Sequence, residues 1–286
     1  MSDFIIMTDS TTDLPESFFD EKNIFQEPHA FIIDEVSYKD LYWKTMGKEQ
    51  YYKLLKDGKH ITTSQADMEK IYADCEKAFS EGRDVLYICF SKELSGTYAT
   101  TRMIAKEMEE KYPGRRFETV DTFSATRGQG MLVEMAAKMR EEGASMDDVI
   151  NTLEIEKDKI YHFFTVDDLM HLKRGGRLSA TSAVMGTLIG IKPVLHMSDD
   201  GKLIPIGKVR GMHKALDEIV RMSLEKIDDS TDKVYVANVG CRENAEYAVK
   251  ALEEKGVRNV VMFDLGPVIS SHVGCGTVGI IFHSEK

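Results

Sequence analysis

The chain has 286 residues, of which 42% are hydrophobic and 30% are charged, and its formal net charge at pH 7 is −11. This length favours two domains over one core. The acidic balance argues against a broad surface for nucleic acid or anionic membranes, so neither is expected as a partner. No apolar run reaches the ~18 residues that a membrane helix needs, and stable membrane insertion is not expected.

The N-terminus and the cysteines favour a cytoplasmic protein. The first residues lack the basic and apolar regions of a signal peptide. The four cysteines contain no C-x-x-C pair, which is typical of a reduced protein rather than a disulfide framework. Cys89 lies in an apolar run and is expected to pack as a small hydrophobic residue.

The first half of the chain alternates strands and helices. Apolar runs predict strands at 4–8, 85–90 and 117–120. Apolar residues at helical spacing predict helices at 67–79, 98–111, 125–142 and 146–157, and an aromatic helix within 38–59. Asp34 and Glu35 suit the turn of a hairpin. Repeated strand–helix units imply right-handed crossovers and a parallel sheet.

The pattern changes near residue 160. Strands are expected at 161–166, 193–197, 203–210, 234–239, 259–264 and 277–282, with helices at 167–172, 213–226 and 242–254. Asp199, Asp200 and Gly201 between two of these strands are a strong hairpin signal. Residues 266–276 read as a loop bounded by glycines. We therefore expect an α/β protein with a parallel-sheet N-terminal domain, 1–158, and an α+β C-terminal domain, 159–286, with a mixed or antiparallel sheet.

The turn at residues 91–98 is the first candidate site. It joins a predicted buried strand to a predicted helix, and ligands of open α/β sheets bind at such carboxyl ends. Ser95 and Thr97 offer hydroxyls, Gly96 allows close backbone approach, and the helix start favours an anion. Helix capping by Ser or Thr next to a turn glycine would explain the same residues. The polar corner at 9–13 could add a rim that includes Ser10.

Two further groups of residues are candidates for binding a ligand or a partner. His272 lies among the glycines of the 266–276 loop, where it suits either ligand contact or a structural hydrogen bond. Lys173, Arg174 and Arg177 surround two glycines, an arrangement that fits anion or partner binding as well as a solvated turn. Phosphate-loop, dinucleotide, zinc-hydrolase and nucleophile-elbow motifs are absent from the sequence, and no metal or cofactor is expected.

Five segments taken together resemble one family. Residues 9–15, 63–65, 94–98, 173–178 and 272–277 look like the successive motifs of the DegV family of bacterial fatty-acid-binding proteins. The resemblance covers nearly the whole chain. It implies two α/β domains with a long-chain fatty acid between them, and an acyl carrier that presents the lipid carboxylate to a separate ATP-dependent fatty acid kinase. Ala66 and Cys275 stand where the family often has proline, which puts acyl-chain preference in question.

The resemblance also implies roles for individual residues. Thr63 and Ser95 would hold the carboxylate with His272 close by, and the rim would include Ser10, Ser64, Gly96 and Thr97. The basic turn would dock the kinase through Lys173, Arg174 and Arg177. The small, apolar stretch 183–191 suggests a tunnel wall, although an amphipathic core helix fits it equally; the expected wall residues are Met185, Leu188, Ile189, Val268 and Ile269.

Two other functions stay open at this point. The first is an enzyme, either an acyl transferase using Ser95 and His272 or a small-molecule kinase domain. Against it, Ser95 lacks the glycine of a nucleophile elbow, no orienting acid is identifiable, and no phosphate loop is present. The second is a regulatory module that senses a lipid, which the sequence does not separate from a carrier.

Overall fold

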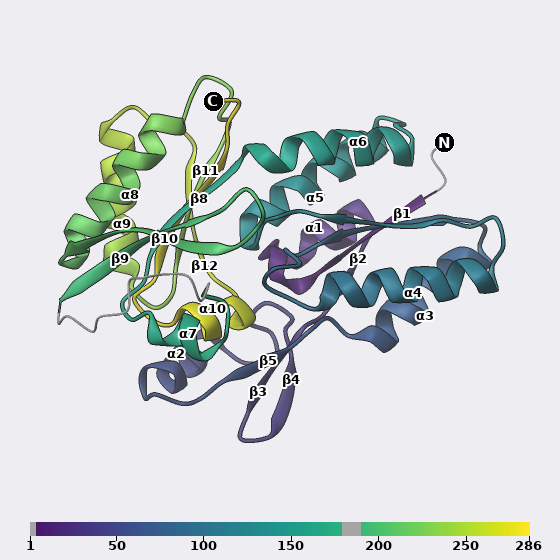
Figure 1. The fold of residues 1–286 in the computed structure, drawn as a ribbon, viewed down its shortest axis with the longest axis horizontal. Helices are drawn as coiled ribbons and strands as arrows, with labels where there is room; N and C mark the ends of the chain where they lie inside the picture. The colour runs from purple at the N-terminus through teal and green to yellow at the C-terminus, as the bar shows by residue number, and fades with distance from the viewer. Residues whose placement is uncertain (1–3, 179–189) are drawn as a thin grey trace. The chain divides into compact units, whose positions relative to one another are not determined.

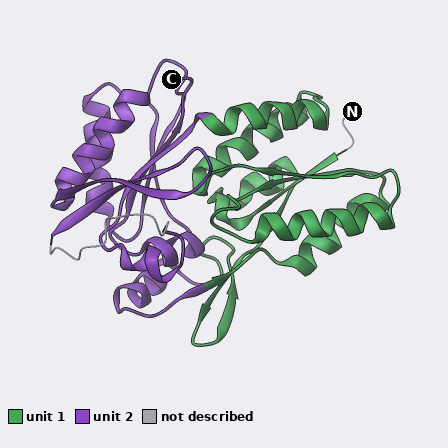
Figure 2. Ribbon diagram, in the orientation of Figure 1, with its two compact units in different colours: residues 1–45, 63–158 green, residues 46–62, 159–286 purple. Residues whose placement is uncertain are grey.

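A computed structural model describes residues 4–178 and 190–286. The chain forms two compact units, drawn in green and purple in Figure 2. Unit 1 comprises Met1–Thr45 and Thr63–Asp158, and unit 2 comprises Met46–Thr62 and Lys159–Lys286. The sequence-based division placed 46–62 in the N-terminal domain, whereas the structure assigns this segment to unit 2.

Specific contacts hold that segment within unit 2. Its helix α2 (Lys48–Lys56) carries Tyr51, whose hydroxyl donates to the carbonyl of Pro267 at 2.6 Å. Lys48 Nζ lies 2.6 Å from a carboxylate oxygen of Asp264. Both partners are more than two hundred residues away along the chain, so the local sequence pattern contained no sign of them.

Unit 1 is built on a four-stranded parallel sheet in the order β2-β1-β6-β7. The strands are β1 (Phe4–Asp9), β2 (Ile24–Glu27), β6 (Asp84–Cys89) and β7 (Phe117–Asp121). β1 and β6 are buried along almost their whole length, as expected for central strands that are covered on both faces. The predicted parallel α/β architecture is confirmed, and Cys89 is fully buried in its core.

Helices cover both faces of this sheet (Figure 1). They are α1 (Glu16–Lys22), α3 (Met68–Ser80), α4 (Thr97–Lys111), α5 (Thr126–Glu141) and α6 (Met146–Glu156). Apolar residues of α3 and α4, including Ile71 and Ile104, form one core cluster with Ile5, Met7 and Tyr87 of the strands. The ends of four of these helices, α3, α4, α5 and α6, match the predicted ranges to within one or two residues. The match is close because the apolar residues at helical spacing pack against a buried sheet.

A second, three-stranded sheet has the order β4-β3-β5, with β3 (Ala30–Ile33), β4 (Val36–Lys39) and β5 (Thr62–Ser64). The predicted hairpin is present, and Asp34 and Glu35 adopt left-handed backbone angles in its turn. The helix expected within 38–59 is wrong over its first half. Tyr42 and Trp43 have positive φ angles, which no helix accepts, and α2 begins only after Gly47.

Unit 2 contains a six-stranded mixed sheet in the order β10-β9-β8-β13-β11-β12. Its strands are β8 (Ile160–Thr165), β9 (Ile191–Met197), β10 (Leu203–Arg210), β11 (Val234–Asn238), β12 (Val260–Asp264) and β13 (Val278–His283). Neighbouring strands are antiparallel except for β11 and β12. The predicted mixed sheet and the hairpin between β9 and β10 are therefore confirmed.

Two long helices, α8 (Met212–Lys226) and α9 (Arg242–Glu254), pack their apolar residues against this sheet (Figure 1). Two short helices correct the sequence-based expectation. α10 (Pro267–Val273) occupies most of the predicted 266–276 loop, with Pro267 in its first turn. α7 (Met170–Arg174) contains Lys173 and Arg174, which were expected in a turn. Within the described ranges, no helix is long and apolar enough to cross a bilayer.

Candidate ligand-binding site

The turn between β6 and α4 places two hydroxyls in contact. Ser95 Oγ lies 2.9 Å from Thr97 Oγ1 and accepts a hydrogen bond from the Thr97 amide at 3.2 Å. Ser95 is half-buried, whereas Thr97 is buried. The capping interpretation is thus partly right: Ser95 satisfies one amide at the start of α4, although Gly96 occupies the cap position itself.

His29 connects this turn to two other segments, and sequence reasoning missed it. Its ring Nε2 lies 3.2 Å from Thr97 Oγ1, and its amide donates to Ser10 Oγ at 3.0 Å. Ser10 Oγ in turn donates to Asp40 at 3.3 Å. The one available signal was a histidine directly after Pro28. The structure therefore ties Ser10 and Thr97 of the expected rim into one hydrogen-bonded set.

The direction of these hydrogen bonds depends on the protons of His29. Thr97 Oγ1 accepts from the amide of Ala66 at 3.2 Å. When Nε2 of His29 carries a hydrogen, Thr97 accepts from it too, so the Thr97 hydroxyl donates to Ser95. The hydroxyl hydrogen of Ser95 is then available to a ligand carboxylate. When Nε2 carries no hydrogen, it accepts from the Thr97 hydroxyl, and the Ser95 hydroxyl then donates to Thr97 instead of to a ligand.

The segment that precedes α3 lies against the same turn. A Cβ atom on Gly96 would come within 2.9 Å of Gln65 Oε1, which also accepts from Thr100 at 3.0 Å. Thr63 and Ser64 belong to β5 just before this segment, where Thr63 is half-buried and Ser64 exposed. A side chain at Gly96 would therefore displace the Gln65 amide, and three of the predicted motifs of unit 1 meet around one helix start.

A buried polar cluster lies at the carboxyl end of the sheet. The Asp9 side chain is fully buried and accepts from the amides of Thr11 at 3.0 Å and Phe90 at 3.2 Å. Gln129 Nε2 of α5 donates to Asp9 at 3.2 Å and to Thr8 at 3.2 Å. These bonds hold the ends of β1 and β6 together, so Asp9 fixes the loops that carry Ser10 and Ser95. Asp9 was expected only as part of a polar rim.

In unit 2, the glycines that follow α7 and α10 allow the two helices to approach each other closely. A Cβ on Gly175 would lie 2.3 Å from Nδ1 of His272, and a Cβ on Gly274 would lie 2.5 Å from the ring of His171. Gly274 also has a positive φ, so this position requires glycine, whereas a side chain at Gly175 would force the imidazole of His272 to move. The half-buried imidazole of His272 is thereby placed directly against the glycine pair that follows α7. His272 belongs to unit 2, whereas Thr63 and Ser95 belong to unit 1.

The three basic residues of the predicted docking turn differ in environment. Lys173 and Arg174 are exposed, and Arg174 Nη2 approaches His171 Nδ1 at 3.4 Å. Burial, together with the Arg174 charge, lowers the pKa of His171. Arg177 is half-buried and its guanidinium donates to the carbonyl of Gly175 at 2.6 Å. Arg177 therefore braces the turn, and only the other two side chains are presented to solvent.

Two of the five expected tunnel-wall residues can be placed. Val268 is buried and Ile269 half-buried, both on α10 rather than on a loop. Met185, Leu188 and Ile189 lie outside the described residues.

The whole chain matches a known family. A family model described as "Uncharacterised protein, DegV family" matches residues 3–285. The chain belongs to the DegV family. A DegV domain-containing protein of Clostridium perfringens is 36% identical over 285 residues, which are 99% of this chain and 98% of that protein.

Solved DegV-family structures share the fold. A fatty acid-binding DegV family protein from Streptococcus agalactiae gives a TM-score of 0.89 at 28% identity, with 100% of both chains covered. A DegV family protein from Thermus thermophilus, described by its fatty acid binding, gives a TM-score of 0.86 at 30% identity, covering 98% of this chain and 99% of the other. The α/β fold with a parallel and a mixed sheet is therefore that of DegV proteins.

This DegV chain also carries a buried acid close to the site. Glu27 ends β2, two residues before His29, and its side chain is fully buried. Lys70 Nζ lies 3.3 Å from Glu27 Oε2 and also pairs with Asp74. Across the strand pair, Glu27 is in register with the buried Asp9. Burial outweighs the attraction of Lys70 and raises the pKa of Glu27 to about 8.

The raised pKa predicts a pH-dependent loss of stability. The folded state retains the Glu27 proton that the unfolded chain loses above its ordinary pKa of 4.5. The free energy of unfolding should therefore fall as pH rises from that value to about 8, by at most about 1.4 kcal/mol per pH unit. Glu27→Gln should remove this slope, as measured by urea denaturation at several pH values. Glu69→Gln, an exposed position on α3, is the control; equal slopes in wild type and Glu27→Gln would contradict the prediction.

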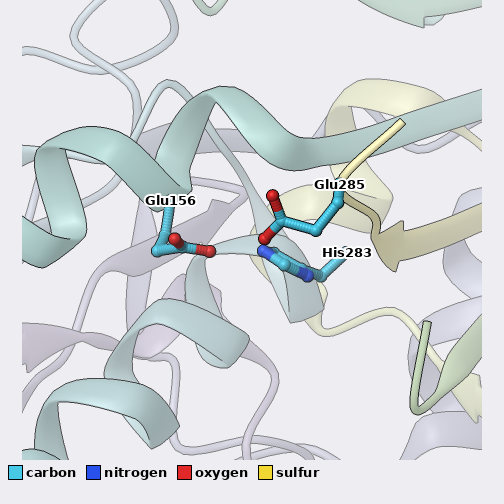
Figure 3. A group of neighbouring side chains, drawn as sticks. All are labelled: Glu156, His283 and Glu285. Atoms are coloured by element: carbon cyan, nitrogen blue, oxygen red, sulfur yellow. The ribbon is translucent and has the colours of Figure 1, made fainter. Parts of the chain in front are cut away.

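Figure 3 shows three side chains of the types that bind metals, Glu156, His283 and Glu285. Glu156 ends α6 in unit 1, whereas the other two lie at the end of unit 2. Glu285 already forms an ion pair with Lys159 at 2.8 Å. The three residues support no assignment of a metal site.

Proposed function

We propose that this protein binds a long-chain fatty acid and presents its carboxylate to a separate fatty acid kinase. The observation that carries the proposal is the hydroxyl-rich turn at Ser95 and Thr97, in a chain of the DegV family, two of whose solved members are described by fatty acid binding. Ser95 and Thr63 are the proposed carboxylate ligands. Because the phosphorylation consumes ATP, the proposed site of action is the cytoplasm.

The chemistry of the turn suits this ligand. A carboxylate is stabilised by hydroxyl and amide donors at a helix start, where the helix dipole is positive. The acyl tail adds about 0.8 kcal/mol for each buried CH₂ group, much of it offset by ordering and association costs. Binding then requires no chemical step by the protein, and the carboxylate stays reactive for another enzyme.

Mass spectrometry tests the proposal directly. Native spectra of the protein purified without detergent should show an added mass above that of the polypeptide. This added mass should disappear under denaturing conditions, and the released molecule should be a fatty acid. A mass that survives denaturation and maps to Ser95 would instead identify a covalent acyl-enzyme. Protein that purifies empty and does not take up added oleate would refute fatty acid binding.

The proposed kinase contact involves Lys173 and Arg174, the two exposed cations of α7. On an otherwise acidic protein, a local cationic surface favours encounter with an acidic partner. We expect the double variant Lys173→Ala/Arg174→Ala to retain fatty acid affinity but to lower the rate of acyl-phosphate formation, with a wild-type rate that falls as salt is added. The measurement is a coupled assay with the kinase encoded in the same genome.

Two controls separate docking from other effects. Lys250→Ala/Lys255→Ala removes the same charge from α9 and its C-terminal end and should react at the wild-type rate. Arg177→Ala is expected to disturb the turn at Gly175 and is therefore not used to score docking. A double variant that is phosphorylated at the full rate, or that loses the lipid itself, would exclude this surface.

A further inference from the structure

Two cysteines of unit 2 lie on segments that run side by side. Cys241 follows β11 and Cys275 precedes β13, and these two strands are antiparallel neighbours, with Asn238 opposite Val278. The pairing continues beyond the strand ends. The amide of Val239 donates to Thr277 at 3.0 Å, and the amide of Gly276 donates to Val239 at 2.9 Å. Val239 thus pairs with both Gly276 and Thr277, and Cys241 and Cys275 lie one or two residues beyond these bonds on neighbouring segments.

The thiol of Cys241 is directed at the segment that carries Cys275. Cys241 Sγ donates to the carbonyl of Thr277 at 3.2 Å, and the amide of Gly276 also faces this sulfur. A Cys275 thiolate would raise the proton affinity of Cys241, and the Cys275 thiol itself lies 3.9 Å from the carbonyl oxygen of Tyr52. Cys275 is flanked by Gly274 and Gly276, both with positive φ, so its segment bends without the restriction of a side chain.

We propose that Cys241 and Cys275 are a redox-responsive pair that forms an intramolecular disulfide when a peroxide oxidises the protein. One thiolate attacks the peroxide, the O–O bond breaks, and a sulfenic acid forms as water leaves. The second thiol attacks that sulfur, the S–S bond forms, the S–O bond breaks, and a second water leaves. One hydrogen peroxide thus accepts two electrons from two thiols, and a dithiol reductant reverses the change.

The other two cysteines are poor candidates for the same chemistry. Cys75 and Cys89 are fully buried in the core of unit 1, and burial raises the pKa of Cys75 to about 12. Cys241 and Cys275 are half-buried. Burial raises the pKa of Cys241 to about 11, whereas the ammonium group of Lys56 acts on both thiols in the opposite direction. The pair should therefore react slowly at neutral pH, and faster by about tenfold per pH unit as the thiolate fraction rises.

The disulfide would constrain a segment of functional interest. It would tie the start of α9 to the loop between α10 and β13, three residues from His272. The expected consequence is slower amide hydrogen exchange in residues 266–278 of the oxidised protein. This inference is independent of fatty acid binding, since each of its readouts is measured on the protein alone.

Tryptic mapping provides the test, because each cysteine falls in a different peptide: 71–77, 84–92, 234–242 and 259–286. The full-length protein is treated with hydrogen peroxide at mildly alkaline pH, alkylated and digested without reductant. We expect loss of two hydrogen atoms from the intact mass, a linked product of 234–242 with 259–286, and recovery of the free peptides after dithiothreitol. Cys241→Ser and Cys275→Ser should each abolish the linked product, while Cys75→Ala should retain it.

Three outcomes would overturn the proposal. They are an intact mass that does not change, a disulfide joining 71–77 to 84–92, and oxygen additions on Cys241 or Cys275 without cross-linking. All three are measured on wild-type protein, so none of them depends on whether a serine variant folds. If the linked product forms but hydrogen exchange in 266–278 is unchanged, the proposed constraint on the α10 segment is wrong.

Discussion

Replacement of Asp9 by alanine should lower the free energy of unfolding by about 3–5 kcal/mol. The Asp9 carboxylate is fully buried and accepts hydrogen bonds from two amides and from Gln129. Alanine would leave the buried amides of Thr11 and Phe90 without this acceptor and would release the ends of β1 and β6 from each other. Gln129 Nε2 would lose one of its acceptors and keep Thr8 and Ile88. Urea denaturation followed by circular dichroism measures the loss.

Two variants make the Asp9 result interpretable. Asp20→Ala removes an exposed carboxylate from α1 and should change stability by no more than about 0.5 kcal/mol. Gln129→Leu removes one donor of the same network, so its effect should be strongly non-additive with Asp9→Ala. Additive effects, or an Asp9→Ala protein as stable as wild type, would mean that the network does not hold the ends of β1 and β6 together.

Replacement of Ser95 by alanine should weaken fatty acid binding by about 1.5–3 kcal/mol, or about 10- to 150-fold in dissociation constant. The variant removes the hydroxyl proposed to donate to the carboxylate, and with it the acceptor of the Thr97 amide. Binding is measured by displacement of a fluorescent fatty acid. A melting temperature recorded on the same sample separates lost binding from lost structure.

Variants at other positions serve as controls for Ser95→Ala. Ser80→Ala removes an exposed hydroxyl that donates to Lys77 at 2.8 Å and should bind like wild type. Thr63→Ala should weaken binding in the same direction as Ser95→Ala. His272→Ala tests whether unit 2 supplies a further ligand. Unchanged affinity in both Ser95→Ala and Thr63→Ala would remove the carboxylate assignment and leave the turn with a capping role only.

The sequence by itself determined the local elements and the order of the site-bearing turns. Residues 85–90 form a continuous run of apolar and aromatic side chains, which is typical of a strand that is covered on both faces. The residues of α4 that follow carry apolar side chains at helical spacing. A hydroxyl-rich turn at the end of such a strand is a local feature, so Ser95 and Thr97 could be named as candidate site residues without coordinates. The same holds for the hairpin at Asp34 and Glu35.

Only the tertiary structure decided which distant segments share a site. His29 meets Thr97 across 68 positions of the chain, Gln129 meets Asp9 across 120, and Tyr51 meets Pro267 across 216. Hydrophobic periodicity predicts which face of a helix or strand is buried, but it does not predict which polar group of another segment that face contacts. For this reason the contact of His29 with Thr97, the burial of Glu27 and the neighbouring positions of Cys241 and Cys275 emerge only when the strands are placed side by side. Hydrogen bonding and desolvation act between neighbours in space.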